Sequence, residues 1–299
     1  KSKNIDSNSI HKFMYKIIEK AGLASLLVNK KNNVNEDRLF KEIYPEIFLQ
    51  AIKKIDFVPY DYLIIDEGQD ILNYNYFVVI DYLIKGGLEN GNWSIFYDPN
   101  RQSGLYNEYS KELIDDLKKF GAAEYRLDKN CRNTKQIVNQ TGILTNFQVE
   151  KSNIDGEKVK IFWYSNESEL LNQLDDLINK LINQNVKEKY ITILFSNKIQ
   201  SYRKFFNQKP KKYIEINYDN VGELPSNKIS FSSVQSYKGL ENEIIIYIGV
   251  NKINGRWIEV VNYIALTRAK EMLYIFLNND LKNEYKNKFK KYLGGLVYE

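Results

Sequence analysis

Two adjacent carboxylates, Asp66 and Glu67, directly follow the apolar run YLII at 62–65 and open the segment DEGQD at 66–70. A short continuous apolar run predicts a buried parallel strand, and α/β sheets bind ligands at the carboxyl ends of such strands. Phosphoryl transfer needs one carboxylate to hold Mg²⁺, usually through water, and a second acceptor to orient and deprotonate the attacking water. Asp66 and Glu67 could supply both groups. The alternative is an acidic turn that merely closes a strand, which is a common feature.

The amino-acid composition excludes several kinds of catalytic and metal site. Cys131 is the only cysteine and His11 the only histidine, so we expect no disulfide framework, zinc cluster, Ser-His centre or Cys-His centre. Catalysis would therefore rest on carboxylates, Arg, Lys, Gln and backbone groups. The net charge of +5 is compatible with a polyanionic partner without requiring one.

Short apolar runs alternate with helical patterns along the 299 residues. The apolar spacing predicts helices near 9–21, 37–54, 73–85, 109–120, 133–145, 166–184 and 258–268, and strands at 62–65, 93–97, 159–164, 190–195, 229–231, 243–248 and 272–276. Such alternation predicts an α/β protein with mainly parallel sheets flanked by helices. One helix ends at Gly121 and a new turn begins at Tyr125, so we predict two domains, 1–125 and 126–299.

Two further segments carry a compositional signal. The stretch 207–227 holds two of the five prolines and predicts a surface loop. The tail combines apolar residues at helical spacing with Lys282, Lys286, Lys288, Lys290 and Lys291, the pattern of an amphipathic basic helix. A solvated face is the simpler interpretation of this helix, and a nucleic-acid contact is the alternative.

Membrane and secretory signals are not found in the sequence. No apolar run approaches the roughly 20 residues that span a bilayer. No charged-then-apolar leader opens the chain. We therefore expect a cytoplasmic protein that does not bind a membrane.

The segment 66–70 resembles motif II of superfamily 1 helicases of the UvrD/Rep kind, and further similarities follow in order along the chain. Segment 97–106 (YDPNRQSGLY) is similar to motif III, and 127–134 (LDKNCRNT) to motif IV. Segment 233–241 (SVQSYKGLE) is similar to motif V, and 263–270 (YIALTRAK) to motif VI. The resemblance implies two RecA-like lobes that bind ATP and Mg²⁺ between them.

The resemblance also implies roles for single residues on the catalytic side. Asp66 would hold Mg²⁺ through water, Glu67 would activate the attacking water, and Gln102 would sense the γ-phosphate. Arg132 and Arg268 would stabilise charge on the transferring phosphoryl group, because a guanidinium stays charged and offers a planar fork to phosphate oxygens. In related NTPases such an arginine finger is worth on the order of 10³ to 10⁵ in rate.

Binding roles follow from the same resemblance. Gly239 and Glu241 would contact the nucleotide, with the carboxylate on the sugar. Nucleic-acid contacts are assigned to Tyr106, Ser233, Gln235 and His11. The His11 assignment rests on segment 9–13, which looks like the family motif between the phosphate loop and motif II, and a purely structural role is its alternative. The chain departs from the family where Gln235 replaces His, Cys131 replaces Tyr, and no Trp follows Tyr106.

A phosphate-binding loop of the form G-x-x-x-x-G-K-[ST] is missing, because none of the 15 glycines is followed by Lys. In the family this loop precedes the motif around His11, so we expect its place upstream of Lys1 and a first lobe truncated at its N-terminus. A natural protein that has lost the loop is the alternative. The chain by itself is expected to hydrolyse little ATP.

These similarities predict part of an ATP-dependent DNA helicase or single-strand translocase that couples ATP hydrolysis between two lobes to movement on nucleic acid. One alternative is an ATPase switch that gates a partner such as a nuclease. Another is a nucleotide-free module that docks nucleic acid or protein. The expected partner is single-stranded or partly duplex DNA, with RNA left open.

Overall fold

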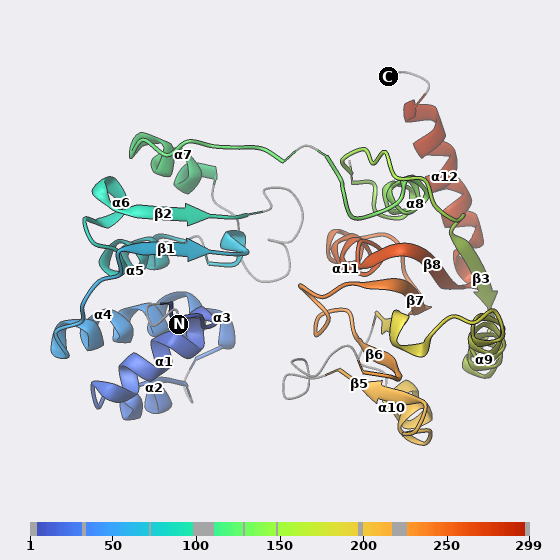
Figure 1. Ribbon diagram of the computed structural model, residues 1–299, viewed down its shortest axis with the longest axis horizontal. Coiled ribbons are helices and arrows are strands. Elements are labelled where there is room, and N and C mark those ends of the chain that lie inside the picture. Colours follow the sequence, from blue (N-terminus) through green and yellow to red (C-terminus); the bar gives the residue numbers. More distant parts are fainter. Residues whose placement is uncertain are drawn as a thin grey trace. The chain divides into compact units, whose positions relative to one another are not determined.

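The computed structural model describes residues 5–31, 34–71, 73–97, 111–127, 129–147, 149–196, 200–216 and 226–296. The chain divides into two compact units, Lys1–Arg126 and Leu127–Glu299 (Figure 1). Both units combine helices with parallel strands, and the second holds a six-stranded sheet. The predicted α/β class, with a mainly parallel sheet flanked by helices, is confirmed.

The first unit contains seven described helices and one pair of strands. Its elements in chain order are α1 (Ile10–Lys20), α2 (Ala24–Lys31), α3 (Glu36–Arg38), α4 (Tyr44–Lys54), β1 (Tyr62–Ile65), α5 (Tyr74–Leu83), α6 (Gly87–Asn90), β2 (Asn92–Ile95) and α7 (Lys111–Lys119). A π-helical segment, Leu39–Ile43, joins α3 to α4 without a break. Strands β1 and β2 run parallel, with Ile65 opposite Ile95. The strand at 62–65 and the helical stretch 37–54 match the predictions.

The second unit is built on a sheet in which every neighbouring pair of strands is parallel, in the order β3-β8-β7-β4-β6-β5. The strands are β3 (Lys160–Tyr164), β4 (Ile191–Phe195), β5 (Tyr213–Glu215), β6 (Ile229–Ser233), β7 (Asn242–Val250) and β8 (Ala269–Asn278). All residues of β4 and β6 are buried, as expected for central strands covered on both faces.

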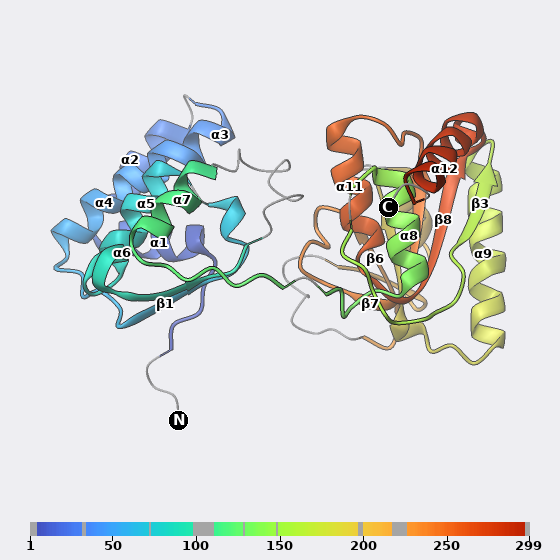
Figure 2. The same cartoon turned by 90° about the horizontal axis from the view of Figure 1, so that it is seen from above.

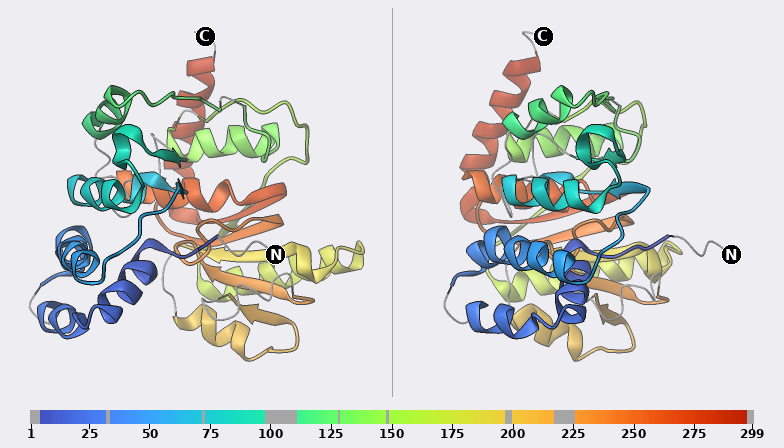
Figure 3. Two further views of the ribbon diagram at one scale, coloured as in Figure 1. Left: turned by 60° about the vertical axis from the view of Figure 1, so that its left-hand side comes forward. Right: turned by 90° about the vertical axis from the view of Figure 1, so that its left-hand side faces the viewer.

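Helices cover both faces of this sheet (Figure 2). They are α8 (Lys135–Thr145), α9 (Glu167–Asn183), α10 (Gln200–Asn207), α11 (Arg256–Leu266) and α12 (Lys282–Leu296). Helices α9 and α10 share one core with the strands, through residues such as Leu174 and Phe206. In the left-hand view of Figure 3, α8 lies above the strands and α10 below them. Helix α8 also packs on α11 and α12.

Some elements differ from the predictions. Helices α2, α6 and α10 were not predicted, and β5 lies inside the stretch 207–227 that was predicted as a loop. Strand β5 has only three residues, too few to show a period of two, so only its pairing with β6 reveals it. Across the residues with described positions, no helix is both long and apolar enough to cross a membrane.

Candidate functional site

The acidic turn after β1 holds its two carboxylates differently. Asp66 is exposed, and one of its carboxylate oxygens accepts a hydrogen bond from the backbone N–H of Glu67 at 3.0 Å. Glu67 adopts a left-handed backbone conformation (φ 54°, ψ 42°) and accepts a hydrogen bond from the side-chain amide of the fully buried Gln69. The turn therefore orients Glu67 from within the protein and leaves Asp66 facing solvent.

Gly68 ties this turn to the second strand. Its N–H donates to the carbonyl of Phe96 at 2.8 Å, just beyond the end of β2. A Cβ atom at position 68 would lie 2.5 Å from Cγ2 of Ile95, closer than real atoms approach. Only glycine therefore allows the turn to pack so closely on β2.

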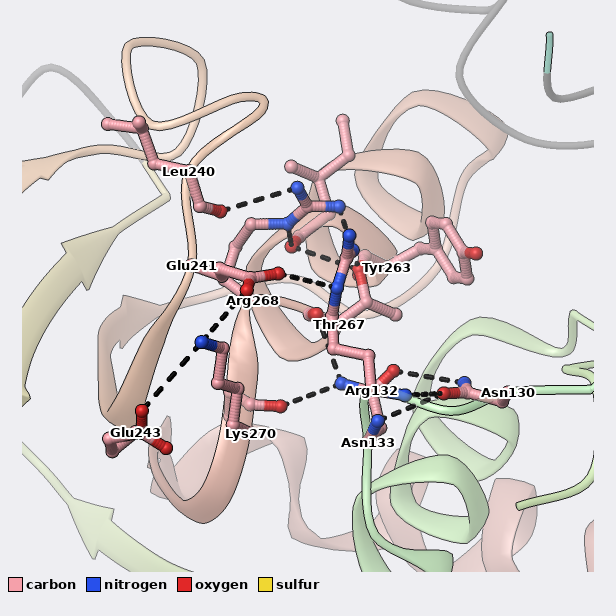
Figure 4. Close-up of polar contacts among 12 residues, drawn as sticks. Asn130, Arg132, Asn133, Leu240, Glu241, Glu243, Tyr263, Thr267, Arg268 and Lys270 are labelled. Carbon is pink, nitrogen blue, oxygen red and sulfur yellow. Dashed lines mark hydrogen bonds and ion pairs between the residues drawn. The ribbon is translucent and has the colours of Figure 1, made fainter. Parts of the chain in front are cut away.

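A second cluster of charged side chains lies in the second unit (Figure 4). Arg132 Nε lies 2.7 Å from one carboxylate oxygen of Glu241, and Lys270 Nζ lies 2.9 Å from the other. Lys270 also lies 3.7 Å from Glu243. The hydrogen bond from Lys270, with Arg132 nearby, lowers the pKa of the Glu241 carboxyl against the opposing effect of burial. The same hydrogen bond raises the pKa of Lys270.

Arg268 belongs to the same cluster but is held by neutral acceptors. Its side chain is 5% exposed and follows the end of α11. The guanidinium donates to the carbonyls of Ile264 at 3.1 Å and Leu240 at 3.4 Å, and to the hydroxyl of Thr267 at 3.3 Å. These bonds orient the guanidinium beside the segment that carries Glu241.

Asn133 joins the segment of Arg132 to the segment of Arg268. Its buried side-chain amide donates to the carbonyls of Thr267 at 3.0 Å and Ala269 at 2.7 Å, one on each side of Arg268. The side-chain oxygen of Asn130 accepts from the N–H groups of Arg132 and Asn133 at 3.0 and 2.9 Å. Two arginines from distant parts of the sequence are therefore fixed in one neighbourhood.

The structure brings together Arg132, Glu241 and Arg268, three of the residues to which the resemblance gives roles, and Gly239 precedes Glu241 by two positions. Gly239 has φ +82°, a conformation that favours glycine, and it lets the chain turn toward Glu241. Asn133 and Lys270 had no predicted role. Both lie inside segments that resemble the family motifs: Asn133 directly follows Arg132, and Lys270 lies two positions after Arg268.

The charged cluster lies at the amino ends of β7 and β8, where Asn242 pairs with Ala269. Ser233 is the last residue of the parallel strand β6, and Gln235 lies two residues beyond it. Both therefore lie at the carboxyl ends of the strands, away from the charged cluster at the amino ends. Ser233 is 5% exposed and its hydroxyl bonds to Ser236 at 2.9 Å. The nucleic-acid roles of both residues stay predictions.

His11 lies in an aromatic environment in the first unit. Its ring packs edge-on against Phe40, Tyr44 and Tyr76, and Nε2 is 2.7 Å from the Tyr76 hydroxyl. That hydroxyl donates to the carbonyl of Phe40 at 3.0 Å. Burial lowers the pKa of His11. These contacts give His11 a packing role, and its contact with nucleic acid stays a prediction.

The remaining two candidates, Gln102 and Tyr106, lie outside the described residues. Among the residues that are described, no group of three or more His, Cys, Asp or Glu side chains could hold a metal ion.

Comparisons with known proteins give matches among solved structures only. No family model matches the chain, and no curated protein matches it. One similar structure is the C-terminal domain of a possible DNA helicase from Lactobacillus plantarum WCFS1, with 16% identity and a TM-score of 0.40, covering 49% of this chain and 86% of that one. Another is the PRRSV helicase, with 10% identity and a TM-score of 0.37, covering 74% of this chain and 35% of that one.

Proposed function

We propose that this chain is part of an ATP-dependent helicase or translocase that moves on single-stranded or partly duplex DNA. The observation that carries the proposal is the joining of Arg132 and Arg268 by Asn133, whose amide bonds to the peptides on both sides of Arg268. These bonds hold the two arginine-bearing segments together. Two arginines in one cluster suit a transferring phosphoryl group, because its charge is spread over several oxygens.

The acidic turn supports the metal-binding half of the proposal. Mg²⁺ usually keeps several of its waters and is held by one or two carboxylates, so a single exposed Asp66 at a strand end suits it. The bound ion would neutralise charge on the phosphate oxygens. Glu67 would accept the proton of the attacking water, and the hydrogen bond from buried Gln69 fixes the direction of its carboxylate.

Glu241 neutralises the charge of Arg132 when no nucleotide is bound, and a phosphate could take its place. Its carboxylate is the anionic partner of Arg132 at 2.7 Å. Phosphate oxygens form the same kind of charge-assisted bonds with a guanidinium as a carboxylate does. In the proposed complex Arg132 would turn to the phosphate, Lys270 would keep Glu241 paired, and Glu241 would accept from a sugar hydroxyl.

The test is ATP hydrolysis by the parent protein, with and without single-stranded DNA. We expect hydrolysis that DNA stimulates, a loss of about 10²-fold or more in Glu67→Gln, and about 10³-fold or more in Arg268→Lys. Glu271→Gln, on the exposed part of β8, is the matched control and should keep full activity.

Other outcomes would point elsewhere. Absence of hydrolysis in the parent protein would overturn the proposal and leave a nucleotide-free binding module. Hydrolysis that DNA stimulates without strand separation or movement would instead favour an ATPase switch that gates a partner such as a nuclease. Motif III favours this second function somewhat, because no Trp follows Tyr106.

A further inference from the structure

Helix α12 carries a stripe of basic and apolar side chains along one flank. The α12 stripe consists of Lys282, Lys286, Phe289, Lys290 and Leu293. Successive helical residues are about 100° apart, so these five side chains fall within an arc of about 100°. Phe289 is 40% exposed and Leu293 is 46% exposed, and the three lysines are exposed beside them. The stripe thus presents cations and apolar surface together.

The acidic side chain of α12 lies away from the stripe. Glu284 is the acidic residue of α12, and its position lies about 180° around the helix from the centre of the stripe. It also accepts a hydrogen bond from Asn254. Lys286 and Lys290 form no ion pair with any other residue that the structure describes. Their charges are therefore available to an external anion.

Aromatic rings continue the stripe onto the edge strand β3, which lies beside α12 in Figures 1 and 2. Lys282 Nζ lies 5.6 Å from the ring centroid of Trp163, which in turn contacts Tyr285 edge-on at 5.8 Å. Tyr285 stacks with Phe289 at 6.4 Å. Three aromatic rings thus form a row alongside the lysines.

The stripe is a preformed surface because neighbouring side chains hold α12 against α8 and α11. The hydroxyls of Tyr285 and Tyr292 bond to Gln140 and Asn139 of α8, both at 3.2 Å. Lys288, only 6% exposed, pairs with Glu259 of α11 at 2.9 Å. These contacts mean that a ligand would not have to order the helix, which reduces the entropic cost of binding.

We propose that the α12 stripe, together with Trp163, binds single-stranded nucleic acid, with phosphates on the lysines and bases against the aromatic row. Lysines along a groove with interleaved aromatic rings are how proteins bind single strands without sequence preference. A membrane fits less well, because Phe289 and Leu293 are the only exposed large apolar side chains among those of α12 that the structure describes. The proposed site uses none of the residues assigned to ATP, so it does not depend on the proposed enzymatic function.

The test is binding of a fluorescein-labelled 20-mer of thymidylate to the 299-residue chain, measured by anisotropy over a range of salt concentrations. In Lys286→Gln/Lys290→Gln we expect weaker binding and a salt slope smaller by about 1.4, since each single-strand phosphate contact contributes about 0.7. The matched control is Lys180→Gln/Lys187→Gln, which removes one exposed lysine in the last turn of α9 and one in the segment that follows it, and which should leave the slope unchanged.

A second variant tests the aromatic row. Phe289→Ala should weaken thymidylate binding about 5-fold or more and leave binding of an abasic 20-mer unchanged, because only the former has bases to stack. Circular dichroism and thermal melting of each variant establish that it is folded.

Three results would overturn the proposal. The first is the same affinity and salt slope in Lys286→Gln/Lys290→Gln as in its control. The second is that wild type binds vesicles containing phosphatidylserine more tightly than it binds thymidylate, and that the stripe variants lose the vesicle binding. The third is the same pair of results with polyglutamate in place of the vesicles. None of these results bears on ATP hydrolysis by the parent protein, so each proposal can fail without the other.

Discussion

The side-chain amide of Asn133 donates a hydrogen bond to the main-chain carbonyl of Ala269 at 2.7 Å, across 136 residues of sequence. The same amide also reaches Thr267 at 3.0 Å, so the turn that carries Arg268 depends on a residue next to Arg132. Asn133 is itself held by Asn130 and by the hydroxyl of Ser152, which donates to its carbonyl at 2.6 Å. The joining of the two arginine segments is therefore a property of the buried polar network.

Replacement of Asn133 by Ala should destabilise the second unit by about 2–4 kcal/mol. The change leaves two buried carbonyls without their donor, and each such loss costs about 1–3 kcal/mol. Urea unfolding followed by circular dichroism measures the effect. Asn139→Ala is the control, since that exposed residue accepts one bond from Tyr292, and it should cost less than about 1 kcal/mol. Equal destabilisation by the two variants would contradict the proposed bridge.

Replacement of Glu241 by Gln should reveal a pH-dependent contribution to stability. The pKa of Glu241 is lowered from 4.5, mainly by its hydrogen bond from Lys270, so the carboxylate stabilises the folded state above pH 4.5. This contribution is lost as the pH falls through the lowered pKa. At pH 7 the expected difference is about 0.5–1 kcal/mol, because the side chain is 35% exposed and solvent weakens the ion pairs.

The measurement for Glu241 is urea unfolding of wild type and Glu241→Gln from pH 7 to pH 3. The difference in the free energy of unfolding should shrink toward zero at the acidic end, where wild type carries a neutral carboxyl. Glu271→Gln changes an exposed carboxylate on β8 and should show a small difference throughout. If the difference in the free energy of unfolding between wild type and Glu241→Gln grew as the pH fell, the carboxylate would not be stabilised by the ion pairs described.

Gly68→Ala should destabilise the first unit by about 1–3 kcal/mol, because the added Cβ would lie 2.5 Å from Cγ2 of Ile95. The double variant Gly68→Ala/Ile95→Ala removes the clashing methyl group, so its cost should be smaller than the sum of the two single costs by about 0.5 kcal/mol or more. Urea unfolding of all four proteins gives this coupling. In the control double variant Gly68→Ala/Ile18→Val, the two costs in the free energy of unfolding should simply add. A coupling as large as that between positions 68 and 95 would argue against a local clash.

Glu259→Gln should destabilise the second unit more than Lys288→Met does. Lys288 is 6% exposed and Glu259 is 17% exposed in their ion pair, so removal of the carboxylate leaves a buried ammonium without its partner, at a cost of about 2–4 kcal/mol. Methionine instead removes the charge and keeps much of the apolar stem. Thermal and urea unfolding should also show that Glu259→Gln/Lys288→Met is more stable than Glu259→Gln alone; the reverse order would contradict a desolvated pair.

Several elements follow from local sequence for physical reasons. Strand β4 was predicted because a strand covered on both faces must be apolar at every position, and Ile191–Phe195 is buried throughout. Helix α9 was predicted because Leu170, Leu174 and Leu181 repeat at the helical period on its buried face. Strand β5 and the short helix α6 were not, since three or four residues are too few to show a period.

The sequence by itself determined the α/β class, most of the helices and strands, and which segments hold the carboxylates and arginines that could act on a phosphate. Only the tertiary structure decided the partners: Glu241 between Arg132 and Lys270, Asn133 across the turn of Arg268, and the row of rings beside α12. Periodicity reports which face of an element is buried, because burial is a local property of each side chain. It does not report that β8 lies between β3 and β7, and this strand order brings the segments of the site together.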